Sequence, residues 1–560
     1  KKARFIASMK VVLLLAVLLV GAAAFPKVTV KGEDTYTMLE GVQCALCTAT
    51  LELTTQYLVL HPEPINDFIR NDVCKLFKEP ALNFFCREMV YFFGDTVIQM
   101  LLNRSNSDTI CKTIYFCHNP QCHLNPLGVR GPEVFASPDY VPGPLAGKQK
   151  LDFNPWELLQ ELYDYFTVDH KPMFDADGDG FSTYPLLRGS HWRGKDCNDG
   201  SEFIYPGRKT NVFSDAYDHD CNGIYGTDPV TKKSWEELLC ANTTRYGLGV
   251  IGDSVGAHFS IPPQYFNASM INGSTYDDLL SKLADEFDIP HQSITTGFVE
   301  DTNSTPVRSL YKYWKEMNLC NHRDFQNVAV NGGDSNDTDT NMQALSRNPA
   351  TDHPMVVVME LIGNDVCFGP GKSTPPEYFK EALLKRLDYL DTVLPPGSHL
   401  IMLGMVNGSL LYDYLHNETH PIGSTYSLVY DWLNCLELSP CPGWLTSDDQ
   451  IRKETTDIAV AINEQYHVVV AENRTYNNFD YIFYEFPAIE IMNEWVKRGG
   501  KPTDLIEPVD GFHPNQIFNA LTADYLWENL KADRPHWIGD VNPNNAKIKE
   551  MFGDQDGYYQ

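Results

Sequence analysis

One short stretch of the chain constrains its fold more than any other: Gly-Asp-Ser-Val-Gly-Ala-His at 252–258. It directly follows an apolar run at 247–251. A strand that ends in a tight, glycine-containing turn can present a serine at the carboxyl edge of a parallel sheet. The helix that follows then offers backbone N–H groups to an anion. The stretch therefore predicts a strand, a turn and a helix with Ser254 at the turn, although so short a motif also occurs by chance.

The sequence from residue 239 onward alternates between apolar runs and segments with helical spacing. The predicted strands are 247–251, 355–361, 399–405 and 467–471, and the predicted helices include 375–394 and 447–465. Apolar strands separated by helices are typical of a parallel sheet that is covered on both faces. A three-layer α/β/α domain is therefore expected over 233–560. Ser254 and Asn364 both fall just after strands, where ligands bind in such sheets.

Three further pieces lie downstream of this serine. They are Asn-Gly-Gly at 331–333, Gly-Asn-Asp at 363–365 and Asp-Gly-Phe-His-Pro-Asn at 510–515. Each of them alone is an ordinary loop composition. Together and in this order, they resemble the sequence blocks of the GDSL, or SGNH, hydrolases. The resemblance implies the SGNH version of the three-layer fold and a hydrolytic activity.

The same resemblance implies a role for each residue of a catalytic site. Ser254 would be the nucleophile, His513 its general base and Asp510 the group that orients the base. The backbone N–H groups of Ser254 and Gly332 and the side chain of Asn364 would form the oxyanion hole. The residue types suit acyl transfer, because a serine hydroxyl is a poor nucleophile until an imidazole takes its proton. Fixed N–H donors then stabilise the tetrahedral oxyanion.

The N-terminus predicts a secreted chain. Met9 and Lys10 precede an unbroken apolar run at 11–24, which ends in three alanines that suit signal cleavage. This run is too short to cross a bilayer, which needs about 20 residues. We therefore assign 1–25 to a signal peptide with its upstream residues and expect an extracellular or lysosomal glycoprotein. The net charge of −30 argues against a nucleic-acid partner.

Six of the fourteen cysteines gather near the N-terminus, at Cys44, Cys47, Cys74, Cys86, Cys111 and Cys117. Segments with helical spacing, such as 51–60 and 89–102, run between them. This pattern resembles the saposin family, in which helices held by three disulfides contact lipid. The resemblance implies an all-helical domain over 38–122 with the pairs Cys44–Cys117, Cys47–Cys111 and Cys74–Cys86. A zinc site is less favoured, since no second C-x2-C is present. The apolar stripes could also pack only against another domain.

The region 123–173 is predicted to be a linker or a propeptide. Residues 124–146 are rich in proline and glycine, as linkers are. Arg130, Lys148 and Lys150 are basic residues at which proteolytic maturation could occur. A short helix is expected at 155–166.

An acidic region at 174–232 predicts a calcium site. Its first piece, Asp-Ala-Asp-Gly-Asp-Gly-Phe at 175–181, matches half of an EF-hand loop, but Leu186 stands where that loop needs glutamate. Two more acidic pieces follow, and the whole resembles the calcium repeats of secreted proteins, with Cys197–Cys221 closing the loop. The alternative is a solvated acidic face. The predicted ligands are Asp175, Asp177, Asp179, Phe181, Asp196, Asn198, Asp199, Glu202, Asp218, Asp220 and Asn222.

The order of these parts resembles the acyloxyacyl hydrolase family, as do the segments 188–194 and 506–515. Members of that family remove secondary, ester-linked acyl chains from the lipid A part of bacterial lipopolysaccharide. The resemblance implies lipopolysaccharide or phospholipid as partner, a lipid surface held by the saposin-like part, and a structural calcium. Two alternatives stay open: a broader phospholipase or carbohydrate esterase, and a lipid-transfer protein whose hydrolase half is inactive.

Cys122 lies just outside the saposin-like set of cysteines. Family precursors are cut between their two parts, which a disulfide then keeps together. The resemblance therefore makes Cys122 the candidate for this link in a two-chain mature form, with Cys435 or Cys441 as its partner.

Overall fold

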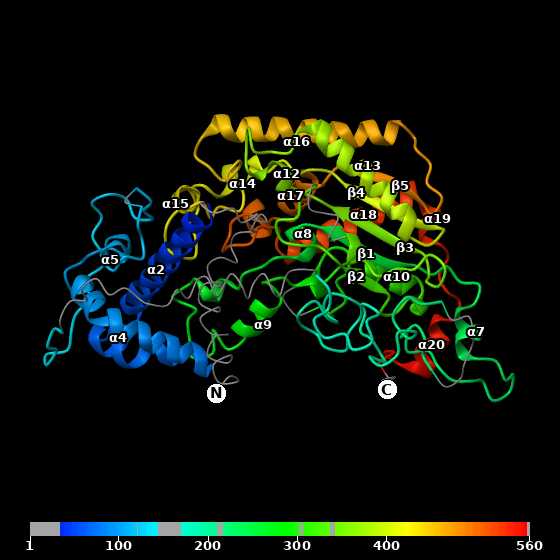
Figure 1. Ribbon diagram of the computed structural model, residues 1–560, viewed down its shortest axis with the longest axis horizontal. Coiled ribbons are helices and arrows are strands. Elements are labelled where there is room, and N and C mark those ends of the chain that lie inside the picture. The colour runs from blue at the N-terminus through cyan, green and yellow to red at the C-terminus, as the bar shows by residue number, and fades with distance from the viewer. Residues whose placement is uncertain are drawn as a thin grey trace.

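The computed structural model describes residues 34–119, 121–143, 170–209, 217–301, 306–335 and 342–556. The predicted signal peptide, the predicted helix at 155–166, and Lys148 and Lys150 lie outside these residues. Among the helices of the described ranges, none is long and apolar enough to pass through a membrane. The chain combines a helical N-terminal part with an α/β part, so the predicted fold class is confirmed (Figure 1).

The N-terminal part is all helical. Its elements are α2 (Asp34–Leu60), α3 (Ile65–Asp67), η1 (Phe68–Asp72), η2 (Val73–Leu76), α4 (Pro80–Leu102) and α5 (Ser107–Thr113). The helix α4 begins with Pro80, where the missing N–H costs nothing, and Asn106 caps α5 by accepting from the Thr109 N–H. The disulfides Cys44–Cys117, Cys47–Cys111 and Cys74–Cys86 join these helices, as the saposin resemblance implied.

The first half of the predicted linker packs against the helical part. The Ile65 N–H donates to the Phe135 carbonyl at 2.9 Å, and the Gly131 N–H donates to the Arg104 carbonyl at 2.9 Å. Leu124 is completely buried. Residues 121–143 therefore extend the helical part.

The α/β part is built on five parallel strands in the order β2-β1-β3-β4-β5. The strands are β1 (Gly247–Gly252), β2 (Phe325–Asn327), β3 (Met355–Glu360), β4 (Ser398–Leu403) and β5 (Phe479–Tyr484). Three predicted strands coincide with β1, β3 and β4. The prediction of a strand at 467–471 is wrong, because these residues form the end of helix α16 (Asp449–Ala471), whose buried face Tyr466 and Val469 continue.

Helices cover both faces of the sheet. Met355, Val357 and Met359 of β3 pack with α13 (Pro376–Val393) and α16, which lie above the strands in Figure 1. The alternate residues Val356 and Val358 pack with α10 (Leu310–Met317) and α18 (Gln516–Asp533) on the other face. This alternation has the period of two that strands impose, so the α/β part is a three-layer domain.

Shorter elements complete the α/β part. They are α7 (Trp235–Cys240), α8 (Ser254–Ala257), η3 (Pro263–Tyr265), α9 (Leu279–Ala284), η4 (Pro290–Gln292), η5 (Leu319–Asn321), α12 (Asn364–Cys367), α14 (Ser409–Leu415), α15 (Tyr426–Cys435), α17 (Ala488–Lys497), η6 (Pro502–Leu505), α19 (Pro535–Ile538) and α20 (Asn545–Phe552).

The two parts of the chain share one apolar core. Val42 and Ala45 of α2 belong to the same cluster of buried side chains as Val429 and Trp432 of α15. Cys122 is bonded to Cys435 at the end of α15, which decides between the two candidate partners. The helical part is thus fixed to the α/β part through α15.

The remaining disulfides lie within the rest of the chain. Cys197–Cys221 closes the acidic region as predicted, and Cys240–Cys320 and Cys367–Cys441 were not paired from the sequence. All fourteen cysteines are therefore paired.

Candidate active site

Ser254 stands where strand β1 passes into helix α8 and is 2% exposed. The preceding residue, Asp253, fixes this turn. One of its carboxylate oxygens accepts the Val255 N–H at 2.9 Å and caps the helix. The other accepts the Ile362 N–H at 2.7 Å, from the loop after β3. Asp253 therefore ties the serine turn to the end of the neighbouring strand.

Ser254, His513 and Asp510 form one hydrogen-bonded chain. The Ser254 Oγ lies 2.7 Å from Nε2 of His513, and Nδ1 of His513 lies 2.8 Å from Oδ2 of Asp510. The other oxygen of Asp510 accepts the backbone N–H groups of Phe512 and His513, which holds the carboxylate in place. With Nδ1–H donating to Asp510, Nε2 is free to accept the serine proton. The arrangement can therefore activate the serine hydroxyl.

The proposed oxyanion donors come from three neighbouring strands. Ser254 follows β1, Gly332 follows β2 and Asn364 follows β3, and parallel strands bring their carboxyl ends to one edge of the sheet. The Asn364 amide donates to the Gly333 carbonyl at 3.1 Å, which joins two of these loops. The Gly333 N–H already donates to Val330 at 2.9 Å, and this favours Gly332 as the oxyanion donor. Gly332 has a φ of 75°, a conformation that suits glycine.

A narrow apolar pocket of about 60 Å³ opens beside Ser254 and His513. Its apolar walls come from α14, α17, η6, α18, the loops after β4 and β5 and the loop that carries His513. The residues are Val406, Leu410, Leu411, Phe486, Ala488, Met492, Leu505, Ile506, Phe512, Pro514 and Phe518. Asn364 lies on its polar side. A hydrocarbon chain attached to an ester at Ser254 would find an apolar surface in this pocket.

Behind the serine turn lies a buried acid that the sequence did not single out. Glu360, at the end of β3, is completely buried. One of its carboxylate oxygens accepts the Thr295 hydroxyl at 2.5 Å, and the other has no hydrogen-bond partner among the described residues. Burial, with a smaller contribution from the Asp253 charge, raises the pKa of Glu360 to about 8. Glu360 therefore carries a proton at neutral pH.

We expect Glu360→Gln to change how stability depends on pH. The folded-state pKa is raised from 4.5 to about 8, so the folded protein keeps a proton that the unfolded chain has lost. The wild-type free energy of unfolding therefore falls as the pH rises from 4.5 to about 8. Glutamine does not ionise, so the variant lacks this pH-dependent loss. Urea unfolding of both proteins should give similar free energies at pH 4.5 and a more stable variant at pH 8. A difference between them that does not change with pH would contradict this expectation.

The first acidic pieces bring carboxylates together. Ligand oxygens of Asp175, Asp177 and Asp199 lie within 4.8 Å of one another, as do those of Asp177, Asp179 and Asp196. Asp177, Asp179 and Asp196 each have one buried oxygen without a hydrogen-bond partner among the described residues. Burial raises the pKa of Asp179 to about 8 and that of Asp196 to about 7, and neighbouring carboxylates add to both shifts. Unpaired, mutually repelling oxygens of this kind fit a divalent cation.

The other predicted ligands of the acidic region are placed around these groups. The Asn198 N–H donates to Asp196 at 2.8 Å, and Glu202 is exposed. The ring of Phe181 is completely buried and stacks on Tyr205.

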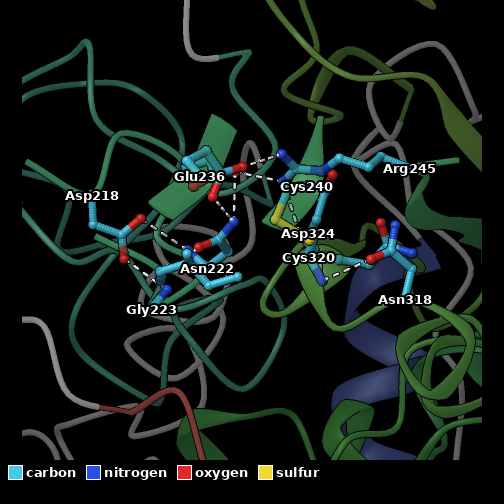
Figure 2. A network of polar contacts seen from close by, with 12 residues as sticks. Asp218, Asn222, Gly223, Glu236, Cys240, Arg245, Asn318, Cys320 and Asp324 are labelled. Carbon is cyan, nitrogen blue, oxygen red and sulfur yellow. Dashed lines mark hydrogen bonds and ion pairs between the residues drawn. A yellow bond between two sulfur atoms is a disulfide. The ribbon is translucent and has the colours of Figure 1, made fainter. Parts of the chain in front are cut away.

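A separate polar network outside both carboxylate groups contains Asp218 and Asn222 (Figure 2). Asp220 belongs to it through Asn222. Asp218 accepts the Gly223 N–H at 2.7 Å. The Asn222 amide donates to Asp220 and to Glu236, each at 3.0 Å.

Arg245 joins this network by pairing with Asp220 at 2.5 Å and with Glu236 at 2.6 Å. Burial raises the pKa of Asp218 well above its usual value and that of Glu236 to about 7. Sequence reasoning missed Glu236 and Arg245, because neither belongs to a recognisable motif.

The fold and the arrangement around Ser254 are those of a carboxylic ester hydrolase, and comparison with known proteins gives the same class. No protein-family model matches the chain. Acyloxyacyl hydrolase of Mus musculus is 34% identical over 98% of this chain and 99% of its own length. The same enzyme of Oryctolagus cuniculus is 35% identical over 92% of this chain and 93% of its own. That of Homo sapiens is 34% identical over 92% and 94%.

The chain therefore belongs to the acyloxyacyl hydrolase family and is a lipid hydrolase. Among solved structures, an extracellular lipase from Streptomyces rimosus is matched over 51% of this chain and 99% of its own length. The sequence identity in that match is 14% and the TM-score is 0.27.

Proposed function

We propose that this hydrolase removes secondary, ester-linked acyl chains from the lipid A part of bacterial lipopolysaccharide. The observation that carries the proposal is the hydrogen-bonded chain Ser254–His513–Asp510 at the mouth of an apolar pocket. Membership of the acyloxyacyl hydrolase family supports the choice of substrate. Pairing of all fourteen cysteines fits synthesis in the secretory pathway and action outside the cell or in lysosomes.

The proposed mechanism is acyl transfer in two halves. Ser254 Oγ attacks the ester carbonyl while its proton passes to Nε2 of His513. The resulting oxyanion accepts the N–H groups of Ser254 and Gly332 and the amide of Asn364. As the ester C–O bond breaks, His513 gives its proton to the departing alkoxide, and an acyl-serine remains.

Water completes the second half of the reaction. His513 takes a proton from a water molecule, whose oxygen attacks the acyl-serine carbonyl. The tetrahedral intermediate collapses and Ser254 regains its proton from His513. A free fatty acid leaves the apolar pocket, and the deacylated hydroxyl stays on the lipid.

In this proposal the helical part, 38–122, holds the lipid while the hydrolase domain, 233–560, cleaves it. Tyr91 and Phe84 of α4 are 81% and 60% exposed, so the helical part presents large apolar side chains to its surroundings. Such a surface suits acyl chains. The region 123–173 would be the site of maturation, after which Cys122–Cys435 keeps two chains joined.

Mass spectrometry of the products tests this proposal. The purified protein and its Ser254→Ala variant are incubated with lipopolysaccharide, and released fatty acids and residual lipid A are measured. Loss of secondary chains only, abolished by Ser254→Ala, is the expected result. Release from phospholipid or from an acetylated glycan, but not from lipopolysaccharide, would assign the site to a broader esterase. Lipid extraction by both proteins without any fatty acid would favour a lipid-transfer protein.

We also propose that calcium occupies the acidic region, 174–232, as a structural ion. Asp175, Asp177, Asp179, Asp196 and Asp199 would hold it, since their oxygens converge and three of them are unpaired. The buried set of Asp218, Asp220, Asn222 and Glu236 would hold another if the ion displaces Arg245. Hard oxygen ligands of this density suit calcium. The ion would neutralise the acidic loops, while proton transfer stays with His513.

Removal of calcium should destabilise the protein without changing the chemistry at Ser254. We expect EGTA to lower the melting temperature at pH 7, with full recovery on addition of excess Ca²⁺, because the ion binds the folded chain only. Asp179→Asn should weaken this calcium dependence, while Asp413→Asn, on the surface helix α14, should leave it unchanged. Equal melting curves with and without EGTA would contradict a calcium site.

A further inference from the structure

Three side chains from one segment hold the loop that carries Asp510 and His513. The Tyr426 hydroxyl donates to the Pro508 carbonyl at 2.6 Å, and the Tyr430 hydroxyl donates to the Gly511 carbonyl at 2.7 Å. His420 contacts the Val509 carbonyl at 2.6 Å. The bonded carbonyls flank Asp510 on both sides. The loop is therefore held through its backbone at the position of the carboxylate that orients His513.

The His420 contact has a defined donor. The Ile422 N–H donates to Nδ1 of His420 at 3.0 Å, so Nδ1 is an acceptor and Nε2 carries the proton that is donated to Val509. Burial lowers the pKa of His420 to about 4, so the ring stays neutral and keeps this arrangement over the range in which most proteins are stable.

The two tyrosines pack so closely on the loop backbone at Gly511 that no side chain fits at this position. A Cβ at Gly511 would lie 2.5 Å from the Tyr430 hydroxyl and 2.6 Å from the Tyr426 ring. Gly511 has a φ of 60°, where glycine is favoured. The two rings are 4% and 1% exposed. The two tyrosines and the loop therefore form a closely packed, buried contact.

The same contact continues into the helical part of the chain. Val509 of the loop is buried in the cluster that also contains Val429 of α15 and Val42 and Ala45 of α2. The Gln56 amide of α2 donates to the Ile422 carbonyl. These contacts link the helical part to the loop. The loop is also supported from the sheet, because Phe512 packs against the cluster that contains Tyr426, Tyr430 and Met359 of β3.

On its other side, His513 meets a second member of this cluster. The ring centroids of Phe259 and His513 are 4.8 Å apart, and Phe259 is 2% exposed. Phe259, Val509 and Val429 of α15 thus belong to the core that the two parts share, and Tyr430 follows Val429 on the same helix.

We infer that Tyr426 and Tyr430 are positioning residues for His513. Through these two tyrosines, the helical part contributes to the hydrolysis even of esters that it does not itself bind. This inference rests on the proposed function of Ser254, His513 and Asp510. The tyrosines touch neither the ester nor Ser254 in this role. They fix the loop so that Nε2 stays within reach of the serine hydroxyl, where a displacement of about 1 Å can cost 10²-fold in rate.

Phenylalanine variants assayed with a short, soluble ester test the inference. The single variants Tyr426→Phe and Tyr430→Phe each lose one hydroxyl group, and the double variant loses both. All three keep the packed rings. With p-nitrophenyl butyrate, which needs no lipid surface, we expect the double variant to lose about 10- to 100-fold in kcat. KM should change little, since the acyl pocket is untouched. Each single variant should fall between the wild type and the double variant.

The matched control is Tyr466→Phe. Tyr466 is completely buried in α16 and its hydroxyl has no hydrogen-bond partner among the described residues, so its removal changes no contact of the loop 507–513. Melting temperatures are measured for all variants, and kcat is compared at a temperature where each is folded. A double variant with the kcat of Tyr466→Phe would overturn the inference, as would a loss confined to KM.

Ser254→Ala separates this inference from the proposed function. If Ser254→Ala still hydrolyses the ester, the proposed site is wrong and the inference falls with it. If Ser254→Ala is inactive and both tyrosine variants equal the wild type, the proposed function stands and the positioning role alone is wrong.

Discussion

Replacement of His513 by glutamine should lower kcat by about 10⁶-fold, the size of effect seen when the base of a comparable serine hydrolase is removed. Glutamine can still donate a hydrogen bond, but it cannot accept and return the Ser254 proton. The Ser254 Oγ has His513 Nε2 as its hydrogen-bonded base at 2.7 Å. Asp510→Asn should cost less, about 10⁴-fold, because the base is kept but its tautomer is wrong.

The His513 prediction is checked by steady-state hydrolysis of p-nitrophenyl butyrate with a melting curve for each variant. His467→Gln serves as the control, since this histidine is about half exposed on α16, where it pairs with Glu485 and contacts the Phe483 ring. It should keep the wild-type kcat. A folded His513→Gln protein that retained more than about one hundredth of the activity would show that another group acts as the base.

The largest loss of stability is expected from Arg347→Met. The guanidinium of Arg347 makes two parallel bonds to Asp324, at 2.8 and 2.9 Å, and the two side chains are 0% and 6% exposed. Removal of the cation leaves the Asp324 carboxylate buried and unpaired beside strand β2. Breaking such a pair costs about 3–5 kcal/mol. Urea unfolding measures the change in the free energy of unfolding.

Two comparisons make the Arg347 result specific. Arg498→Met removes an arginine whose pair with Glu494 is about half exposed, and should change stability by less than about 1 kcal/mol. The double variant Arg347→Met, Asp324→Leu removes both charges and should recover part of the loss. If Arg347→Met and Arg498→Met were equally stable, the buried pair would contribute nothing.

The six-residue strands whose residues are all buried could be predicted from the sequence. The runs at β1, β3 and β4 are apolar because both faces of these strands are covered, and this pattern is visible in the sequence. The three valines at 468–470 have the same composition but continue a helix, because contacts of Tyr466 and Val469 with the sheet outweigh the local preference of β-branched residues. The strand β2 is only three residues long and leaves no periodic signal.

The candidate site likewise contains residues that the sequence predicts and residues that it does not. Ser254, Asp510 and His513 lie in short motifs whose residue types suggest their chemistry, and the structure brings them into hydrogen-bond contact. The groups that support them, such as Thr295, Glu360 and Tyr430, come from distant segments and carry no motif of their own. Their partners are set by packing of the folded chain, which a single sequence does not reveal.

The disulfide between Cys122 and Cys435 has a consequence for how the chain behaves on dilution. It joins residues 313 positions apart across the boundary between the helical part and α15. If the intervening chain is cut, separation of the two pieces remains an intramolecular event, governed by an effective concentration near millimolar for short tethers. Dilution into a large volume of fluid would then leave the helical part bound to the α/β part that carries Ser254.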